Sequence, residues 1–382
     1  MAGARIVLLG ATGFTGQCVA EALVARGARP VLAGRDPAKL GTLAASLGVD
    51  VEIAHADVND YASIAALVGR GDVLISTVGP FVKHGEAAVR AACETGAHYF
   101  DSTGEGPFIR EVFERYGPAA QKSGSGLLTA FGYDYVPGNV AAALALTQTG
   151  TEAVRVDSAY FITDANGRRD LRARFRLPSA GTVSTLLALL PELGYTLRGG
   201  SMRTERVARA VGTFSVDGQR LSGVSIGALE QFGLPRSFPQ LREVNVHLGW
   251  FDPFSRLLQF GARSFDGPIR RRLARRVLDR LGPRLTAGRP AGPPPEVRAN
   301  MRALIVGAAY NAQGTELSRV VLRGPDPYTF TADLLAWGAI EASEGRLRGT
   351  GALGPVEAFG LDELEHGCAQ AGLTATEGAA QR

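Results

Sequence analysis

The residues best suited by type and spacing to do chemistry are three glycines near the start of the chain. Gly10, Gly13 and Gly16 lie between an apolar run at 6–9 and a helix-forming segment at 17–26. A strand, a glycine turn and a helix in this order let a pyrophosphate approach the backbone, because no Cβ stands in its way. The first N–H groups of the helix then attract the phosphates. This segment predicts a dinucleotide-binding loop.

The end of the second predicted strand, Gly34-Arg35, distinguishes NADP from NAD. Proteins that select NAD usually carry an acidic residue here, about 20 residues past the glycines, to hold the ribose hydroxyls. A guanidinium can instead pair with a 2′-phosphate, and Lys39 in the next helix is a second candidate cation. We therefore predict NADP(H). Asp57 and Val58 are expected near the adenine edge, although Asp57 equally suits the start of a helix.

The segments behind the fourth and fifth predicted strands lie at the sheet edge where such folds bind ligands. The turn at 77–81 bends sharply and is expected to line the ribose and nicotinamide, with a purely structural turn as the alternative. Asp101 and Glu105 are expected at the same edge. The complete set of predicted cofactor contacts is Gly10, Thr12, Gly13, Phe14, Thr15, Gly16, Gly34, Arg35, Lys39, Asp57, Val58, Thr77, Val78, Gly79, Pro80, Phe81 and Ser102.

Four residues are candidate catalytic proton donors. Tyr133, Asp134 and Tyr135 follow the sixth predicted strand, and Lys83 follows the turn behind the fourth. A tyrosine hydroxyl donates a proton when its pKa is lowered, and a lysine carries donor N–H groups near neutral pH. Asp134 equally suits the N-terminus of a helix that starts near residue 137. No tyrosine has a lysine four residues after it, so the catalytic pair of short-chain dehydrogenases is missing.

Four motifs in this order resemble the saccharopine dehydrogenase-like (saccharopine reductase-like) oxidoreductases. They are the glycine loop 10–16, the turn 76–81, the segment 99–105 and the segment 131–137. The nearest-looking branch includes bacterial stand-alone proteins and the mycobacterial trans-acting enoyl reductases. The resemblance covers residues 5–145 and implies NADPH-dependent reduction of C=N or C=C bonds. It also implies a second domain whose mixed sheet shapes the substrate site and forms a homodimer. The family's glycine-phenylalanine-aspartate turn appears here with Tyr133, which adds a hydroxyl.

The elements that position these residues change character near residue 150. Before it, strands and helices alternate, which predicts an α/β domain with a Rossmann-type doubly wound parallel sheet. After it, period-two alternation predicts an α+β domain with a largely antiparallel or mixed sheet. The segments expected as strands there are 155–162, 171–177, 204–217, 221–229, 241–248 and a hairpin over 301–323, with a helix at 182–193. We predict a Rossmann domain at 1–148, a substrate-binding and dimerisation domain at 149–325, and C-terminal helices at 326–382 that return to the first.

Composition excludes several classes of protein. A net charge of +4 is too small to indicate nucleic-acid binding. Cys18, Cys93 and Cys368 have no metal-ligand spacing and no disulfide pattern, which predicts no metal site and suits a reducing cytoplasm. The first strand begins within a few residues of the N-terminus, so no signal peptide is expected. No apolar run reaches the roughly 18 residues that span a bilayer.

Arginines crowd two places in the second half of the chain. They are Arg172, Arg174 and Arg176 on one predicted strand, and six arginines on a predicted amphipathic helix at 269–285. One interpretation is a docking surface for an acidic partner such as an acyl carrier protein, or for an anionic membrane surface. The other is a solvated face of an arginine-biased protein.

The sequence as a whole predicts an NADPH-dependent reductase of cytoplasmic specialised metabolism. Hydride would pass to a C=C, C=N or C=O bond of a small-molecule or acyl substrate. Two alternatives stay open. One is a regulatory protein that senses NADP(H) without turnover, and the other is an amino-acid C–N dehydrogenase of saccharopine type.

Overall fold

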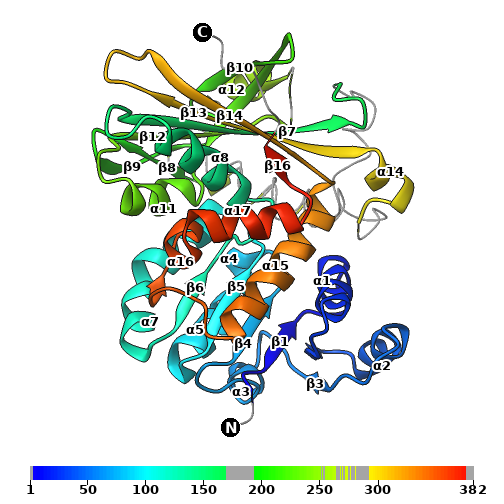
Figure 1. Cartoon of the computed structure of the whole chain (residues 1–382). Coiled ribbons are helices and arrows are strands. Elements are labelled where there is room, and N and C mark those ends of the chain that lie inside the picture. The colour runs from blue at the N-terminus through cyan, green and yellow to red at the C-terminus, as the bar shows by residue number, and fades with distance from the viewer. Residues whose placement is uncertain are drawn as a thin grey trace. The chain divides into compact units, whose positions relative to one another are not determined.

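The chain divides into two compact units in the computed structural model (Figure 1). The structure describes residues 3–168, 193–250, 252, 254–263, 267, 269, 272–273, 276, 280 and 292–375. Unit 1 comprises Met1–Val136 and Pro327–Ala371, and unit 2 comprises Pro137–Asp326 and Gly372–Arg382. Unit 1 is therefore assembled from two segments that lie far apart in the sequence.

Unit 1 is built on a seven-stranded parallel sheet in the order β15-β6-β5-β4-β1-β2-β3. Its strands are β1 (Ile6–Leu9), β2 (Val31–Gly34), β3 (Ile53–His55), β4 (Val73–Ser76), β5 (His98–Asp101), β6 (Gly126–Leu128) and β15 (Gly351–Ala352). β1, β2 and β4 are buried along their whole length, as strands covered on both faces are. The predicted doubly wound sheet is confirmed, because the strand order reverses between β1 and β4.

Helices cover both faces of this sheet (Figure 1). They are α1 (Phe14–Ala25), α2 (Pro37–Ser46), α3 (Tyr61–Ala65), α4 (Phe81–His84), α5 (Glu86–Thr95), α6 (Gly106–Glu111), the π-helical η1 (Val112–Tyr116), α7 (Gly117–Ser123), α15 (Pro327–Ser343), α16 (Pro355–Phe359) and α17 (Leu361–Gln370). α1 and α15 pack together on one side, and α5 and α7 pack on the other. Trp337 of α15 stacks on Phe131, with 6.5 Å between ring centroids, so the C-terminal helices complete the core of unit 1.

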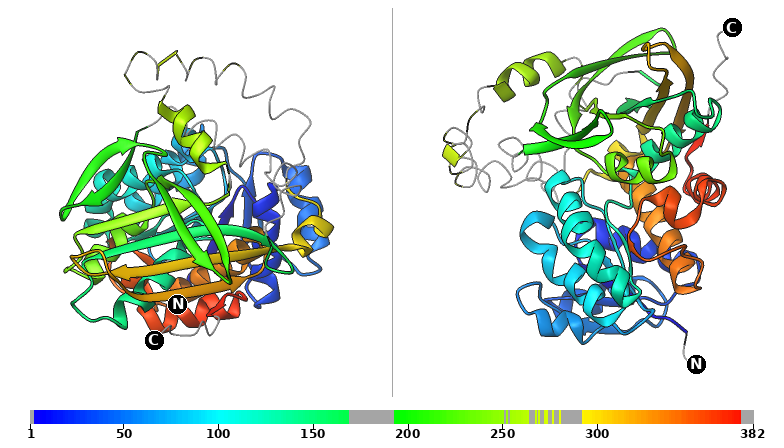
Figure 2. Two further views of the ribbon diagram at one scale, coloured as in Figure 1. Left: turned by 90° about the horizontal axis from the view of Figure 1, so that it is seen from above. Right: turned by 90° about the vertical axis from the view of Figure 1, so that its left-hand side faces the viewer.

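Unit 2 is built on a mixed sheet in the order β10-β11-β12-β7-β13-β14-β16, with β8 paired to β12 and β9. Its strands are β7 (Arg155–Asp164), β8 (Leu193–Arg198), β9 (Ser201–Arg206), β10 (Val211–Val216), β11 (Gln219–Ile226), β12 (Glu243–Leu248), β13 (Met301–Tyr310), β14 (Glu316–Gly324) and β16 (Thr374–Ala375). β7 and β12 run parallel and the other pairs run antiparallel, which confirms the predicted mixed sheet. Figure 2 shows β7, β13 and β14 lying side by side.

The helices of unit 2 that lie among the described residues are α8 (Val136–Thr147), α11 (Glu230–Ser237), α12 (Ser255–Arg263) and α14 (Pro295–Ala299). α8 lies against β13 so closely that a Cβ on Gly307 would stand 2.4 Å from the carbonyl carbon of Ala141. This packing explains why the division into units falls between Val136 and Pro137, whereas the sequence placed a boundary at 148.

Several expectations for unit 2 need correction. The predicted strand 204–217 is two strands, β9 and β10, and the chain turns between them at Ala208, whose φ is 56°. Leu193 begins β8 and does not end a helix. The segment 171–177 with Arg172, Arg174 and Arg176, the rest of 182–193 and most of the helix at 269–285 lie outside the described residues.

Candidate functional site

The glycine loop behind β1 is a tight turn held by its neighbours. Gly10 has a φ of +84°, and its N–H donates to the carbonyl of Ala33 at 2.9 Å. A Cβ on Gly10 would lie 2.7 Å from Cγ2 of Val78, and one on Gly16 would lie 2.3 Å from the carbonyl oxygen of Gly10. Only glycine fits at these two positions, because side chains would displace the backbone of the loop or of the segment behind β4.

The loop presents the N-terminus of α1 to solvent. Gly13 is the N-cap residue, and no side chain of the described residues caps it. The first helical hydrogen bond runs from the N–H of Gln17 to the carbonyl of Gly13, at 2.9 Å. The N–H groups of the first turn therefore have no acceptor inside the helix, and the positive end of the helix dipole faces the same way. This arrangement suits a phosphate.

Arg35 lies exposed at the carboxyl end of β2. Asp57 follows β3, which pairs with β2 up to Gly34 and His55. A backbone N–H from Asn59 lowers the pKa of Asp57, and the positive charge of Arg35 lowers it further. Arg35 and Asp57 therefore share one end of the sheet edge.

Lys39 is a weaker candidate for a phosphate contact. Its Nζ lies 3.6 Å from Oδ2 of Asp36, which also caps α2 by accepting from the N–H groups of Ala38 and Lys39. Part of the Lys39 charge is thus balanced within the helix. Val58, the next residue after Asp57, is half-buried at the same edge.

The turn behind β4 is tied to the glycine loop at one end and to a buried carboxylate at the other. The hydroxyl of Thr77 donates to the carbonyls of Leu9 and Gly10, both at 3.2 Å. The Gly79–Pro80 peptide bond is cis, and α4 starts directly after it. Glu105, which is 1% exposed, accepts from the N–H of Phe81 at 3.0 Å and of Val82 at 2.9 Å.

Asp101 joins the ends of β5 and β6. Its Oδ1 accepts from the N–H of Thr103 at 2.8 Å and from that of Ala130 at 2.9 Å. The Thr103 hydroxyl in turn accepts from the N–H of Glu105 at 3.0 Å. Burial raises the pKa of Asp101 to about 6, although the two backbone N–H groups oppose this shift. The loops behind β4, β5 and β6 are therefore joined through one hydrogen-bonded segment. Ser102 lies half-buried within it.

Asp134 is the predicted proton donor with the most perturbed surroundings. Its Oδ2 lies against Gly104, where a Cβ would approach to 3.0 Å. Its Oδ1 is buried and has no hydrogen-bond partner among the described residues. Burial raises the pKa of Asp134 to about 7, so the carboxyl is part-protonated near neutral pH. A group with this pKa can both release and recover a proton under physiological conditions.

The other three candidate donors differ from Asp134 in their hydrogen bonds and their exposure to solvent. The hydroxyl of Tyr135 donates to the carbonyl of Gly104 at 2.9 Å, so its proton is already engaged. Tyr133 is 2% exposed, and its backbone N–H donates to the hydroxyl of Thr331 at 3.0 Å. Lys83 is exposed in the last turn of α4.

Sequence patterns did not predict two groups of interactions in this site. One is the pairing of Glu105 with the α4 backbone, although Asp101, Thr103 and Glu105 stand at alternate positions behind a strand, which is a weak local signal. The other is the contribution of Thr331, which no local pattern connects to Tyr133, 198 residues earlier.

Comparison with known proteins identifies the family. Residues 6–127 match the family model described as the saccharopine dehydrogenase NADP binding domain. A trans-acting enoyl reductase of Mycobacterium leprae is 27% identical over 384 residues, which cover 87% of each chain. Residues 6–127 of this chain are therefore a saccharopine dehydrogenase-type NADP-binding domain. The family predicted from the four motifs is confirmed, and so is NADP(H) as the cofactor.

Further relatives of this saccharopine dehydrogenase-like chain match in part. A Mycobacterium tuberculosis protein, provisionally named for the same enoyl reductase activity, is 34% identical over 191 residues. The match covers 48% of this chain and 44% of that relative, so it spans less than half of the relative's length. Saccharopine dehydrogenase (L-Glu forming) from Saccharomyces cerevisiae shares the fold, with a TM-score of 0.58 and 16% identity over 98% of this chain and 99% of its own. Homospermidine synthase from Legionella pneumophila also shares the fold, with a TM-score of 0.57 and 12% identity over 100% of this chain and 94% of its own.

The residues present fit NADP(H). Gly10 and Gly16 leave the space that a pyrophosphate needs, and the uncapped start of α1 offers N–H donors. Arg35 stands where a 2′-phosphate would be read. The individual contacts and the catalytic roles stay predictions.

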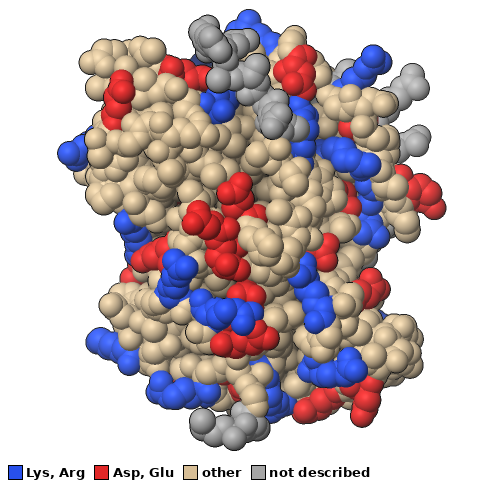
Figure 3. All heavy atoms as spheres, in the orientation of Figure 1, with Lys and Arg blue, Asp and Glu red and all other residues tan. Residues whose placement is uncertain are grey.

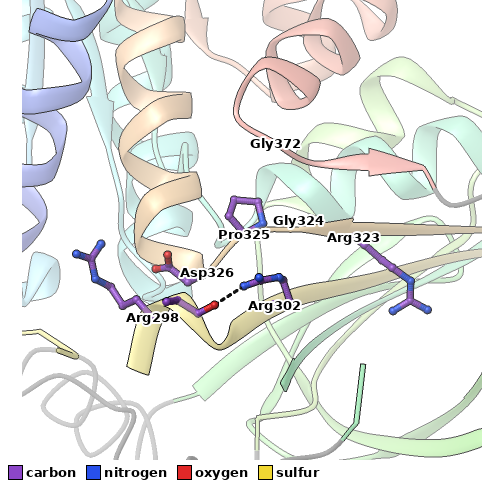
Figure 4. A pocket seen from close by; sticks show the side chains of 8 residues that line it. Arg298, Arg302, Arg323, Gly324, Pro325, Asp326 and Gly372 are labelled. Atoms are coloured by element: carbon purple, nitrogen blue, oxygen red, sulfur yellow. Dashed lines mark hydrogen bonds between the residues drawn. The ribbon is translucent and has the colours of Figure 1, made fainter. Parts of the chain in front are cut away.

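Unit 2 of the saccharopine dehydrogenase-like chain has a shallow pocket of about 550 Å³ (Figure 4). Arg298, Arg302, Arg323 and Asp326 line it together with Ala299, Gly324, Pro325 and Gly372. Arg302 donates to the carbonyl of Ala299 at 2.9 Å, and Arg323 pairs with Asp217. In Figure 4 the guanidinium groups of Arg298 and Arg323 point away from each other. The pocket therefore has no convergent set of cations for one anion.

The described part of the chain adds three observations. Positive and negative side chains are interspersed over the face shown in Figure 3. The described residues contain no group of three or more His, Cys, Asp or Glu side chains that could hold a metal ion. They also contain no helix with the length and apolar character needed to cross a bilayer.

Proposed function

We propose that this chain is an NADPH-dependent reductase of an activated double bond, with the C=C bond of an acyl substrate as the first choice and a C=N bond as the second. The names of the mycobacterial relatives support the enoyl substrate. The observation that carries the reductase assignment is Asp134 at the edge of the NADP-binding sheet: its Oδ1 atom is buried without a hydrogen-bond partner among the described residues, and burial raises its pKa to about 7. Reduction of a double bond needs one hydride and one proton, and Asp134 can hold that proton.

Different residues of unit 1 would bind the cofactor and donate the proton. The glycine loop and the start of α1 would hold the pyrophosphate, and Arg35 would hold the 2′-phosphate. NADPH, when bound, supplies the hydride from its nicotinamide ring. Asp134 would then give its proton to the neighbouring carbon or nitrogen of the substrate and recover one from water. Tyr133 and Lys83 are the reserve candidates, because the Tyr135 proton is already engaged with Gly104.

The remaining assignments have less support and stay predictions. An acyl substrate would be delivered on an acyl carrier protein or as a free small molecule. The family resemblance supports a homodimer, and composition supports a cytoplasmic location.

The test follows deuterium from NADPH into product. The purified chain is incubated with NADPH deuterated at nicotinamide C4 and with a panel of α,β-unsaturated acyl thioesters, imines, and 2-oxo acids mixed with amino acids. Mass spectrometry of the products should show one deuterium in a saturated acyl thioester. Asp134→Asn should slow this transfer at least about tenfold while the affinity for NADPH stays within about twofold. Tyr133→Phe removes a single hydroxyl from the same loop and tests the reserve donor; if Asp134 supplies the proton, this variant should keep the transfer rate within about twofold of the wild type.

Two results would overturn the proposal. Tight NADPH binding with no deuterium transfer over the whole panel would point to a protein that senses NADP(H). Transfer only to the mixture of 2-oxo acid and amino acid would point to C–N chemistry of saccharopine type.

A further inference from the structure

We propose that Asp101, Thr103 and Glu105 form a positioning relay that fixes the nicotinamide side of the cofactor site and leaves the adenosine side alone. These residues act through the backbone that they hold. The inference rests on the proposed function in one respect, since it takes the turn at 77–81 as the nicotinamide side.

Asp101 anchors the relay at the sheet. Its side chain is fully buried at the end of β5, and Oδ1 accepts from the N–H groups of Thr103 and Ala130 at 2.8 and 2.9 Å. Ala130 has a φ of 56°, which is uncommon for a residue with a side chain. One carboxyl oxygen thus sets the direction in which the chain leaves both β5 and β6.

Thr103 connects Asp101 to Glu105 through hydrogen bonds. It is fully buried, and its hydroxyl oxygen accepts from the N–H of Glu105 at 3.0 Å. This bond closes a turn between residues 103 and 105 and fixes the backbone from which the Glu105 carboxylate projects.

Glu105 binds the backbone directly behind the turn that follows β4. Each of its carboxyl oxygens accepts one backbone N–H, from Phe81 and from Val82. α4 has only four residues, and a helix of one turn has little stability of its own in water. A carboxylate at its N-terminus satisfies two otherwise unpaired donors through charge-assisted bonds.

Packing from the same segment reinforces the capping bonds. Phe108 of α6, three residues after Glu105, packs on Phe81 with 5.7 Å between ring centroids. A Cβ on Gly85, at the end of α4, would lie 2.4 Å from the Phe108 ring. The segment 101–108 therefore holds both ends of α4.

The adenosine side is held by separate interactions. Asp36 caps α2 near Arg35, and Asn59 binds the Asp57 carboxylate through its backbone and its side chain, both at 2.9 Å. The hydrogen bonds of the relay described above run to the backbone of Phe81, Val82 and Ala130, behind β4 and β6. Loosening the relay should therefore weaken binding of the whole dinucleotide and spare a ligand that has only the adenosine 2′-phosphate half.

The experiment compares two ligands on the full chain by isothermal titration calorimetry. The ligands are NADPH and adenosine 2′,5′-bisphosphate, which lacks nicotinamide. Thr103→Val removes the acceptor for the Glu105 N–H and should raise the Kd for NADPH about tenfold, with the Kd for the bisphosphate within about twofold. Thr103→Ser keeps the hydroxyl and should leave both values unchanged.

A second pair of variants tests the end of the relay. Glu105→Gln keeps the shape but turns an N–H donor toward one of the two backbone donors, so it should behave as Thr103→Val. Glu111→Gln is the control, because Glu111 pairs with the exposed Arg115, one helical turn along the chain, at 2.7 Å. If Thr103→Val does not fold, the Glu105 and Glu111 pair decides the question by itself.

Equal losses for both ligands would overturn the relay, since they would show a general structural role. Unchanged affinity for both ligands would overturn it as well. Failure of the proposed function has a different signature: the wild-type chain would bind NADPH yet transfer no hydride, whatever the variants do to the two Kd values.

Discussion

At the scale of single residues, the two ends of the sheet edge differ in burial and in charge. Arg35 and Asp57 at the β2–β3 end are accessible to solvent, whereas Asp101, Glu105 and the Oδ1 atom of Asp134 are buried behind β5 and β6. An exposed cation suits recognition of a phosphate, while buried carboxyls suit positioning and proton storage. Side-chain chemistry therefore changes along the length over which a dinucleotide would extend.

The exposed end gives a prediction about cofactor choice. Arg35→Ala should raise the Kd for NADPH by about tenfold or more, because a charge-assisted contact to the 2′-phosphate is lost. The Kd for NADH should change less than about twofold. Lys39→Ala is the matched control and should have a smaller effect, since Lys39 already pairs with Asp36. Fluorescence titration with both cofactors checks this, and equal losses for NADPH and NADH would refute the Arg35 assignment.

The buried end gives a prediction about pH. The pKa of Asp134 is about 7 in the folded protein against an ordinary 3.8, so the folded state keeps a proton that the unfolded chain releases between these values. This contribution stabilises the fold fully below pH about 4 and is lost as the pH rises through 7. Relative to Asp134→Asn, the wild-type free energy of unfolding should fall by up to about 1.4 kcal/mol per pH unit in this window.

Urea unfolding of both chains at several pH values between about 5 and 8 measures this difference. Half-buried His98 and buried His247, whose pKa values are lowered by desolvation, favour the opposite trend below pH 6.5. Their contribution is common to both chains and cancels in the comparison, as does that of Asp101. A difference that is independent of pH would contradict the raised pKa of Asp134.

At the scale of elements, each segment of the cofactor site belongs to a strand end and the loop behind it. β1 leads to the glycine loop, β2 to Arg35, β4 to the turn at 77–81, and β5 and β6 to the segments joined by Asp101. The parallel sheet brings all these strand ends to one edge. In the loop behind β1, close contacts leave no room for side chains at Gly10 and Gly16.

Two glycines of neighbouring helices therefore make a matched test. Gly16→Ala in α1 should abolish measurable NADPH binding and lower stability, because its Cβ would stand 2.3 Å from the Gly10 carbonyl oxygen. Gly41→Ala in α2 meets nothing within 4 Å and should raise the free energy of unfolding by about 0.5–1 kcal/mol through helix propensity. Calorimetric titration and thermal unfolding measure both. NADPH binding by Gly16→Ala with wild-type affinity would refute the geometry of the loop.

At the scale of the whole molecule, unit 1 depends on the end of the chain. α15 covers a face of the sheet, and Trp337 and Phe359 enclose Phe131 with centroid distances of 6.5 and 5.6 Å. β15 extends the sheet by pairing with β6. A fold assembled from both ends of a chain cannot complete its core before the last segment is present.

This dependence can be tested by truncation. A chain that stops after Asp326 should lose NADPH binding and cooperative unfolding, because the aromatic core around Phe131 would be open to water. A chain that stops after Leu373 keeps α15, α16 and α17 and should bind NADPH with wild-type affinity. Circular dichroism and fluorescence titration distinguish the two. Wild-type NADPH affinity in the shorter chain would show that residues 1–326 fold without the returning helices.

The sequence by itself determined the features that depend on short stretches of chain. The glycine spacing at 10–16, Arg35 behind an apolar strand, and the alternation of strands and helices before residue 150 all follow from local periodicity, propensity and backbone sterics. These same stretches carry the family resemblance and the choice of NADP(H), because recognition of a pyrophosphate and of a 2′-phosphate needs few residues at fixed spacing.

Only the tertiary structure decided the features that join distant residues. Glu105 caps α4 across 24 positions, Thr331 binds the backbone of Tyr133 across 198, and residues 351–352 pair with β6. The raised pKa of Asp134 also belongs here, because desolvation depends on everything packed around a carboxyl and not on its neighbours in sequence. Local sequence patterns do not predict such partners, because the pairing energy depends on which surfaces the completed fold brings together.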